Sequence, residues 1–345
     1  MKQPAIVVTS LFVAALAACV IPAMAADDRI PATPGFSGNV IFGVGVLDLE
    51  SNVVAGNKLL GVDNKTISSV NASPQSANSV YPMITGEVRY TFSSGWQAFF
   101  GSSVEDLLTL DFSQRLGVRK EWDRVGVMGI ALMFSGTPAE VWADPYLVGV
   151  PRSDTARDAN GLRLDWWRMF DSNFFLQARS RKIRINNEQS GTDPALGLTP
   201  AEISSLRRNG NDNLLTVGYR WLNGRSLWQP EISFGKANRD GNAVSNDMTM
   251  ARLSYSRWNE DWLLVASGLV FRQKYDDPNP VFGQKTDTSS YALTVTAARR
   301  LTLGDGGWRA FASAAYGRSN ADVNFFDSKA LGFNLGLQYG FGAPQ

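Results

Sequence analysis

Charged side chains recur at alternate positions in many segments of this chain, and they are the residues with the most evident chemistry. Arg163 and Asp165, for example, alternate with Leu162 and Leu164. In an extended strand, side chains two positions apart lie on one face and their neighbours on the other. The same pattern places a larger set on the polar faces of their strands: Asp111, Arg115, Arg119, Arg163, Asp165, Arg179, Arg181, Arg220, Glu231, Arg252 and Arg300.

Arginines outnumber acids in this polar set, and two interpretations follow. The guanidinium group is always charged and binds carboxylate or phosphate through two parallel hydrogen bonds, so an enclosed face of this kind would favour anionic or polar solutes. Alternatively, the arginines neutralise Asp111, Asp165 and Glu231 in an ion-pair lattice inside a narrow barrel. Both interpretations hold if the lattice lines an open channel.

Several kinds of chemistry are excluded by composition. The chain has no histidine, and Cys19 is its single cysteine, so Ser-His and Cys-His catalysis and tetrahedral zinc sites are not expected. No pair of Asp or Glu residues stands out from ordinary loop charge. The sequence therefore predicts no catalytic residue, no metal site and no cofactor. Lys and Arg total 33 against 32 Asp and Glu, and this balance argues against a nucleic-acid partner.

The segment 328–341 shows what kind of wall could carry such a polar face. Leu331, Phe333, Leu335, Leu337, Tyr339 and Phe341 alternate with Gly332, Asn334, Gly336, Gln338 and Gly340. One face is apolar and the other consists of glycine and amides. This pattern is typical of a strand with hydrocarbon on one side and water on the other, as in an outer-membrane barrel.

Similar alternation recurs along the whole chain and predicts fourteen strands, at 36–50, 82–92, 96–105, 107–120, 125–136, 158–169, 173–187, 212–222, 227–237, 246–258, 261–275, 286–302, 307–318 and 328–341. The connections alternate between short turns and longer loops, as expected of an up-and-down barrel. The predicted fold is an all-β, transmembrane, antiparallel barrel. Its strand count could be 12 to 16, because the connection at Glu105-Asp106 is very tight.

Tryptophans support this fold, because most of them lie within a few residues of a predicted short turn. An indole ring at the headgroup level buries its apolar body and keeps its N–H hydrated. Within the loop at 188–211, Thr199 to Glu202 forms a capping box and Asn209-Gly210 a stop signal, which predicts one short helix. This helix would pack within its loop or fold over the mouth.

The first 25 residues have the features of an export signal: Lys2, an apolar core and the small-x-small site Ala23-Met24-Ala25. Cleavage after Ala25 is the main prediction, and lipoprotein processing at Cys19 is the alternative. Residues 26–345 would then form a single domain in the bacterial outer membrane. After residue 25 the sequence has no run of 18 apolar residues, so no transmembrane helix is predicted.

The outer loop between the fifth and sixth predicted strands carries Asp144, Arg152 and Arg157 beside Pro145 and Pro151. A loop of this length can fold inward, so these three charged residues are the predicted constriction or ligand contact. The alternative is that the loop packs on the rim through its own aromatic residues.

Three stretches of the chain resemble a known family. They are Pro34 to Gly38, Val141 to Tyr146 and Gly161 to Trp166, of which the Trp-Ala-Asp-Pro-Tyr run is the most specific. They are similar to the proteobacterial barrel family catalogued as domain of unknown function 2860. The resemblance runs over nearly the whole mature chain and implies an outer-membrane or periplasm-facing β protein. It implies no substrate and no catalytic residue.

The function predicted from the sequence is a porin-like channel for passive passage of small polar or anionic solutes, without enzymatic activity. The alternative is a closed structural or surface-binding barrel whose long extracellular loops carry the function. The predicted partners are outer-membrane lipid and lipopolysaccharide, the barrel-assembly machinery and small polar or anionic solutes. The sequence leaves the oligomeric state open.

Overall fold

The computed structural model describes residues 29–57, 60–61, 65–102, 112–304 and 307–342. The predicted signal peptide, the connection at Glu105-Asp106 and the predicted inner-face residue Asp111 lie outside this described part of the chain.

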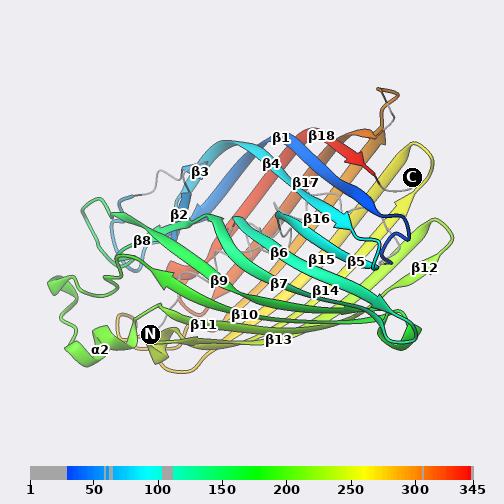
Figure 1. Cartoon of the computed structure of the whole chain (residues 1–345). Coiled ribbons are helices and arrows are strands. Elements are labelled where there is room, and N and C mark those ends of the chain that lie inside the picture. The colour runs from blue at the N-terminus through cyan, green and yellow to red at the C-terminus, as the bar shows by residue number, and fades with distance from the viewer. Residues whose placement is uncertain (1–28, 58–59, 62–64, 103–111, 305–306, 343–345) are drawn as a thin grey trace.

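Fourteen wall strands, counted within the described residues, form a single antiparallel sheet (Figure 1). They are β1 (Gly35–Ser51), β4 (Ser76–Thr91), β5 (Trp96–Ser102), β6 (Phe112–Trp122), β7 (Gly126–Thr137), β9 (Asp154–Trp167), β10 (Phe174–Ile185), β11 (Gly210–Tyr219) continued by β12 (Trp221–Asn223), β13 (Ser226–Arg239), β14 (Asn246–Trp258), β15 (Trp262–Tyr275), β16 (Thr288–Arg300), β17 (Trp308–Ala321) and β18 (Ser328–Phe341).

Closure of the sheet depends on β1, which pairs with β4 on one side and with β18 on the other. The β1–β18 ladder runs from Gly38 opposite Phe341 to Ser51 opposite Ser328. Each described wall strand therefore pairs with a strand on either side, and the sheet closes on itself, as a membrane requires. The predicted fold class, a closed antiparallel barrel of fourteen strands, is confirmed.

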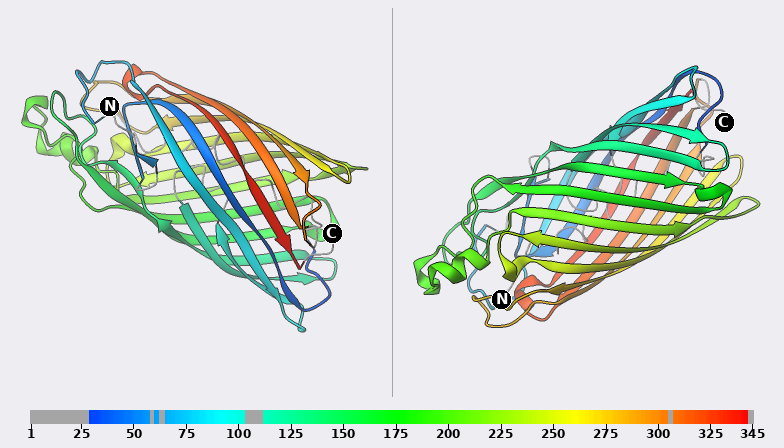
Figure 2. Two further views of the ribbon diagram at one scale, coloured as in Figure 1. Left: turned by 90° about the horizontal axis from the view of Figure 1, so that it is seen from above. Right: turned by 60° about the horizontal axis from the view of Figure 1, so that its bottom comes forward.

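The two ends of the barrel differ in the length of their connections. Short turns such as 92–95, 123–125 and 259–261 lie at one end, whereas the long loops lie at the other. The long loops contain three short strands, β2 (Val54–Asn57), β3 (Leu60–Gly61) and β8 (Ala139–Trp142), and the helix α2 (Pro200–Ser205). Figure 2 shows α2 at the far end from the C-terminus, with the wall strands inclined between the two ends.

The alternation in β18 explains which face of the wall is outside. Leu335 is 61% exposed on the outer surface, whereas its neighbour Asn334 is 1% exposed and Gln338 is buried on the same inner face. A charged side chain on the lipid-facing surface would cost about 2–4 kcal/mol at mid-depth. The apolar outer face is therefore the membrane surface.

Aromatic pairs gather at the short-turn end, where a girdle at the membrane interface is expected. Trp96 stacks edge-on with Trp122 at 5.9 Å between ring centroids, and Trp308 lies 4.9 Å from Tyr339. Trp166 is half-buried nearby and donates its indole N–H to the Val125 carbonyl at 2.9 Å.

Some predicted boundaries are wrong. β9 begins at Asp154 rather than 158, so Arg157 belongs to the wall and not to the loop. The capping box at Thr199 and Glu202 is present, but α2 ends at Ser205, before Asn209. Gly210, part of the predicted stop signal, instead begins β11. No helix in the described ranges is long and apolar enough to cross a membrane.

Candidate functional site

The inner wall from β4 to β14 carries most of the charged residues predicted for the polar face, and we call it the charged arc. Arg163 and Arg181 are buried there, as is Glu231. Half-buried residues of the predicted set are Arg115 and Arg119 on β6, Asp165 on β9, Arg179 on β10, Arg220 between β11 and β12, and Arg252 on β14. Arg300 is exposed at the short-turn end of β16. Their pore-lining role stays a prediction.

Ion pairs within the charged arc run along and across strands. Arg163 donates from Nε to Asp165 Oδ1 at 2.9 Å, and the two residues are two positions apart on β9. Arg252 on β14 lies opposite Glu231 on β13 and donates to Glu231 Oε2 at 2.9 Å. Arg115 reaches Glu87 on β4 at 3.1 Å. The predicted ion-pair lattice therefore exists for Arg163 and Arg252.

One carboxylate in the charged arc is shared by several arginines. Asp212, on β11, accepts from Arg239 through Oδ1, and its Oδ2 lies 3.8 Å from Arg181 and 4.0 Å from Arg157. The side chains of all three arginines are at most 3% exposed. These four residues form what we call the Asp212 cluster, the densest group of buried charge on the described inner wall.

The sequence prediction missed Asp212 and Arg239. The predicted strand at 227–237 ended one alternation too early, although Glu231, Ser233, Gly235, Ala237 and Arg239 follow a strict two-residue period. Asp212 was the first residue of its predicted strand and was not assigned a face. Extending the alternation from Ala237 by two positions would have found Arg239, and continuing it back from the inward Thr216 would have put Asp212 on the inner face.

The rest of the inner wall, on β15 to β18 and β1, is different, and we call it the uncharged arc. Hydroxyl pairs join neighbouring strands: Thr296 lies 2.9 Å from Ser313, and Ser290 lies 2.7 Å from Ser319. Small or amide residues such as Ala292, Ala315 and Asn334 fill other inward positions. Arg300 and Arg309 mark its short-turn end, where they lie opposite each other in the register.

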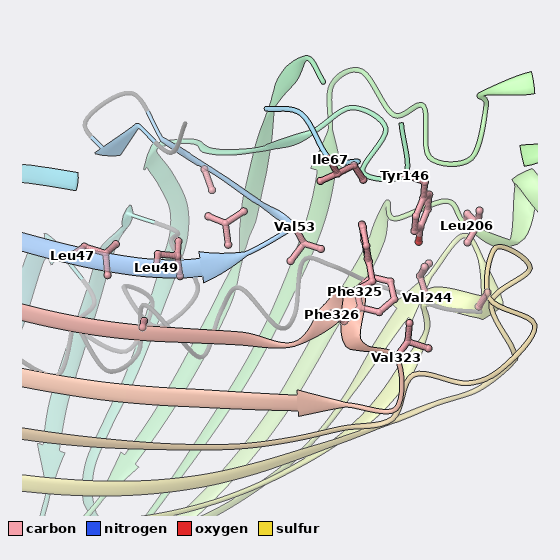
Figure 3. Close-up of a cluster of buried hydrophobic side chains, with 14 of the residues drawn as sticks. Leu47, Leu49, Val53, Ile67, Tyr146, Leu206, Val244, Val323, Phe325 and Phe326 are labelled. Atoms are coloured by element: carbon pink, nitrogen blue, oxygen red, sulfur yellow. The ribbon is translucent and has the colours of Figure 1, made fainter. Parts of the chain in front are cut away.

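The long loops pack together over the other end of the barrel around an apolar cluster (Figure 3), which we call the extracellular cap. Its buried residues come from segments far apart in the sequence: Leu47, Leu49, Val53, Val54, Ile67, Tyr81, Ala139, Tyr146, Leu206, Ala243, Val244, Val323, Phe325, Phe326 and Ala330. Tyr146 lies 6.0 Å from Phe325 between ring centroids and accepts a hydrogen bond from Asn279. The loops are thus held to one another.

Arg152 fixes the cap through backbone carbonyls. Its guanidinium donates to the carbonyl oxygens of Asn52, Lys65 and Pro145, and its Cζ lies 4.5 Å from the centroid of the Trp142 ring. Burial lowers the pKa of Arg152 to about 10, while the nearby Asp144 carboxylate opposes this shift. The group stays protonated at neutral pH and joins the first long loop to the 138–153 loop.

A second arginine, Arg208, links the α2 loop to the same cap. It donates to Glu188 Oε2 at 2.8 Å and to the carbonyls of Trp142 and Ala143 at 2.8 and 2.9 Å. Although burial opposes it, Arg208 lowers the pKa of Glu188 below its usual value. Burial instead raises the pKa of Asp144, against the hydrogen bond that the Tyr146 amide donates to it.

The predicted constriction set is therefore divided between two places. Asp144 and Arg152 lie buried in the extracellular cap, whereas Arg157 lies on β9 in the Asp212 cluster. The structure does not bring the three residues together as one ligand contact. The alternative prediction, a loop packed by its own aromatic residues, describes Trp142 and Tyr146, which are both buried.

A closed antiparallel barrel with an apolar outer belt and aromatic pairs at its short-turn end defines an outer-membrane β-barrel. The family model described as "Protein of unknown function (DUF2860)" matches residues 35–340. The chain belongs to this family, as the resemblance of its sequence implied. No curated protein matches the chain.

Solved structures of other barrels show similar architecture. OmpT, an outer membrane protein of Vibrio cholerae, is 10% identical, with 88% of this chain and 98% of that chain covered and a TM-score of 0.40. The outer membrane channel DcaP of Acinetobacter baumannii is 8% identical (91% and 99% covered, TM-score 0.44). An anion-selective porin from Comamonas acidovorans is also 8% identical (90% and 99% covered, TM-score 0.39). At these identities the likeness extends to the fold alone.

Proposed function

We propose that this barrel is a porin-like channel for the passive passage of small polar solutes, and of anionic solutes in particular. The carrying observation is the excess of arginine over carboxylate on the described charged arc. It is clearest at Asp212, where one carboxylate faces Arg157, Arg181 and Arg239.

The electrostatic reason is that a low-dielectric wall weakens screening and strengthens the field of fixed charges inside it. A wall with surplus guanidinium groups raises the local concentration of anions and lowers that of cations. Arg179 and Arg252, both half-buried, lie on the same inner face as the buried clusters. They are the arginines through which the wall would act on a passing solute.

The uncharged arc completes the proposal, because it offers hydroxyl groups without fixed charge. Thr296 and Ser313 can exchange their mutual hydrogen bond for bonds to a solute or water. Ser267 on β15 can do the same with its 2.8 Å bond to Ser254 on the adjoining strand β14. A polar anion would thus meet guanidinium donors on one side and hydroxyls on the other. The extracellular cap would limit access from outside.

The test is ion selectivity in planar bilayers under a salt gradient, using purified, refolded protein. We expect single-channel steps and a reversal potential of the sign that marks anion preference. Arg252→Gln should move this potential towards zero. Arg184→Gln is the matched control, because Arg184 is exposed on the outward face of β10, opposite to the inward face that carries Arg181. Protein that resists denaturation as a barrel but gives no conductance would refute the proposal.

The extracellular cap favours a second candidate function, a closed barrel whose loops bind a partner at the cell surface. The specific observation is that Phe325, Phe326 and Tyr146 are almost completely buried among segments from several loops. Such a cap would be a rigid platform rather than a gate. The same bilayer experiment separates the two functions, because a platform gives no conductance even after the cap is loosened by mutation.

A further inference from the structure

The outer surface of β15 to β18 changes from apolar to basic towards the long-loop end. Arg272 and Lys274 are exposed on β15, and Arg318 is exposed on β17. All three face outward, since they alternate with the buried Gln273, Tyr275 and Ser319. We call these three residues the basic rim.

Strand register brings the basic rim together with two tyrosines. Tyr291 on β16 lies directly opposite Arg318 on β17, and its ring lies 6.1 Å from that of Tyr316. Ser289 on β16 is opposite Arg272 on one side and Asn320 on the other. Because neighbouring strands are about 4.8 Å apart, Arg272 and Arg318 stand within about 15 Å, and their long side chains can approach one group.

Local hydrogen bonds also order the rim. Arg318 donates from Nε to the Asn320 side-chain oxygen at 2.9 Å, which leaves its terminal nitrogens directed away from that bond. Nearby lysines already have partners: Lys329 pairs with Glu50 at 2.6 Å, and Lys236 with Asp276 at 2.7 Å. Asp247, which lies opposite Lys274 on β14, also contacts Lys236 at 3.2 Å. Arg272, Lys274 and Arg318 thus add their positive charge to lysines and acids that already pair with one another.

An apolar surface begins immediately beside the rim on the same strands. Val270 precedes Arg272 by two positions and is 58% exposed, and Leu293 follows Tyr291 by two positions and is 59% exposed. Two-residue spacing puts each pair on the same outward face. A ligand for this surface thus needs an anionic head and a hydrocarbon body, in that order from the long-loop end.

We propose that Arg272, Lys274 and Arg318, with the hydroxyls of Tyr291 and Tyr316, bind the phosphate groups of the glycolipid of the outer leaflet, phosphorylated lipid A. Guanidinium groups bind phosphate through paired, charge-assisted hydrogen bonds. The long loops of such barrels face the cell exterior, so the rim meets the leaflet that contains this glycolipid. Its acyl chains would lie along Val270 and Leu293. This inference requires no channel activity.

The experiment measures lipid bound to the purified barrel in detergent by native mass spectrometry, with lipid A as the titrant. The test variant carries Arg272→Ala and Arg318→Ala. The matched control carries Arg257→Ala and Arg299→Ala, which remove two exposed arginines from β14 and β16 at the short-turn end. We expect the test variant to lose at least about tenfold in affinity, as removal of charged hydrogen bonds predicts, and the control to change little.

Two further arms identify the chemistry. Lipid A without its phosphates should bind no better to the wild type than to the test variant, and phosphatidylglycerol should not displace phosphorylated lipid A. Equal loss in the test and control variants, no loss in either, equal binding of the dephosphorylated lipid, or displacement by phosphatidylglycerol would each overturn the proposal. If the double alanine variant does not refold, Arg272→Gln with Arg318→Gln replaces it.

Discussion

The charged arc and the extracellular cap both bury arginines, but they satisfy them in different ways. In the charged arc, Arg163 and Arg252 pair with carboxylates on the same or the neighbouring strand. In the cap, Arg152 is held by three backbone carbonyls and the Trp142 ring. The carbonyls carry no net charge, so they hold the guanidinium group in place without neutralising it. The hydrogen bonds of Arg152 serve to connect the loops.

This difference indicates that the arginines of the charged arc affect ion selectivity, whereas those of the cap hold the loops together. Replacing an arginine that pairs with a carboxylate on the inner wall changes the electric field inside the barrel. An arginine bound to carbonyls joins loop segments that no β-ladder connects, such as Asn52 and Pro145. Mutations in the charged arc should therefore alter ion preference first, whereas mutations in the cap should alter loop order first.

The largest effect is expected from Arg152→Ala. Loss of the guanidinium removes its hydrogen bonds to the carbonyls of Asn52 and Pro145, whereas the Lys65 carbonyl keeps the backbone N–H of residue 152 as a donor. Each buried unsatisfied carbonyl costs about 1–3 kcal/mol. Opening of the cap should become easier by about 4 kcal/mol in total. Hydrogen exchange should accelerate in residues 65–75 and 143–153, and any conductance should increase.

Arg184→Ala is the control for this experiment, because it removes an exposed arginine from the outer wall. Exchange in the cap should then match the wild type. Unchanged exchange after Arg152→Ala would contradict the role of Arg152 as the link between the loops.

A moderate effect is expected from Glu231→Gln on the inner wall. Arg252 then loses its counter-charge, which is buried, whereas Arg252 itself is partly exposed and screened. The variant should lose about 1–2 kcal/mol of stability in denaturant unfolding, less than a fully buried pair would lose. Its anion preference should increase, because one negative charge leaves the wall.

The double variant Glu231→Gln with Arg252→Gln tests this reasoning. It should recover part of the stability and return the reversal potential towards the wild-type value. A reversal potential that does not respond to either variant would mean that this ion pair does not face the conducting path.

The wall was largely predictable from the sequence, and its physical basis is local. In β18, alternation of Asn334 with Leu335 records which side is hydrocarbon, because each lipid-facing charge is costly. The two-residue alternation of polar and apolar side chains was sufficient to place Arg163, Arg181 and Glu231 on the inner face. It failed only at strand ends, where Arg157 and Arg239 continue the pattern into segments predicted as loops.

The cap was not predictable, because its contacts join loops with no periodic pattern. Tyr146 meets Asn279 and Phe325 across more than a hundred residues, and Arg208 reaches Trp142 from the α2 loop. The sequence signalled that charged residues and prolines cluster at 144–152. It could not distinguish a pore constriction from a structural link, since both use a buried arginine.

A pH effect is expected in the cap from Glu188, whose pKa is lowered by Arg208. A lowered folded-state pKa means that the stabilisation is complete above the unfolded value near 4.5 and is lost as the pH falls through the folded-state pKa. Acidification below pH 4.5 should therefore lower the hydrogen-exchange protection factors around Trp142 and Ala143, which correct for the intrinsic slowing of exchange in acid. Glu188→Gln should remove this acid response and loosen the cap already at neutral pH.

Asp144 should change the stability of the cap with pH in the direction opposite to Glu188, because burial raises the pKa of Asp144 above 3.8. Its contribution favours the cap below that unfolded value and is lost as the pH rises through the folded-state pKa. Asp144→Asn should thus stabilise the cap at neutral pH and leave the acid loosening from Glu188 intact. If the acid response disappeared in Asp144→Asn, the titrating group would be Asp144 and not Glu188.

The smallest effect is expected in the uncharged arc, from Thr296→Val. The substitution removes the hydroxyl that lies 2.9 Å from Ser313 and keeps the shape of the side chain. A neutral hydrogen bond contributes about 1 kcal/mol, and Ser313 can turn its hydroxyl to water if the inner wall is wet. Stability should fall by less than about 1 kcal/mol, and the reversal potential should not change, because no charge is altered. A loss several times larger would indicate that this part of the wall is dry, which would favour a closed barrel over a channel.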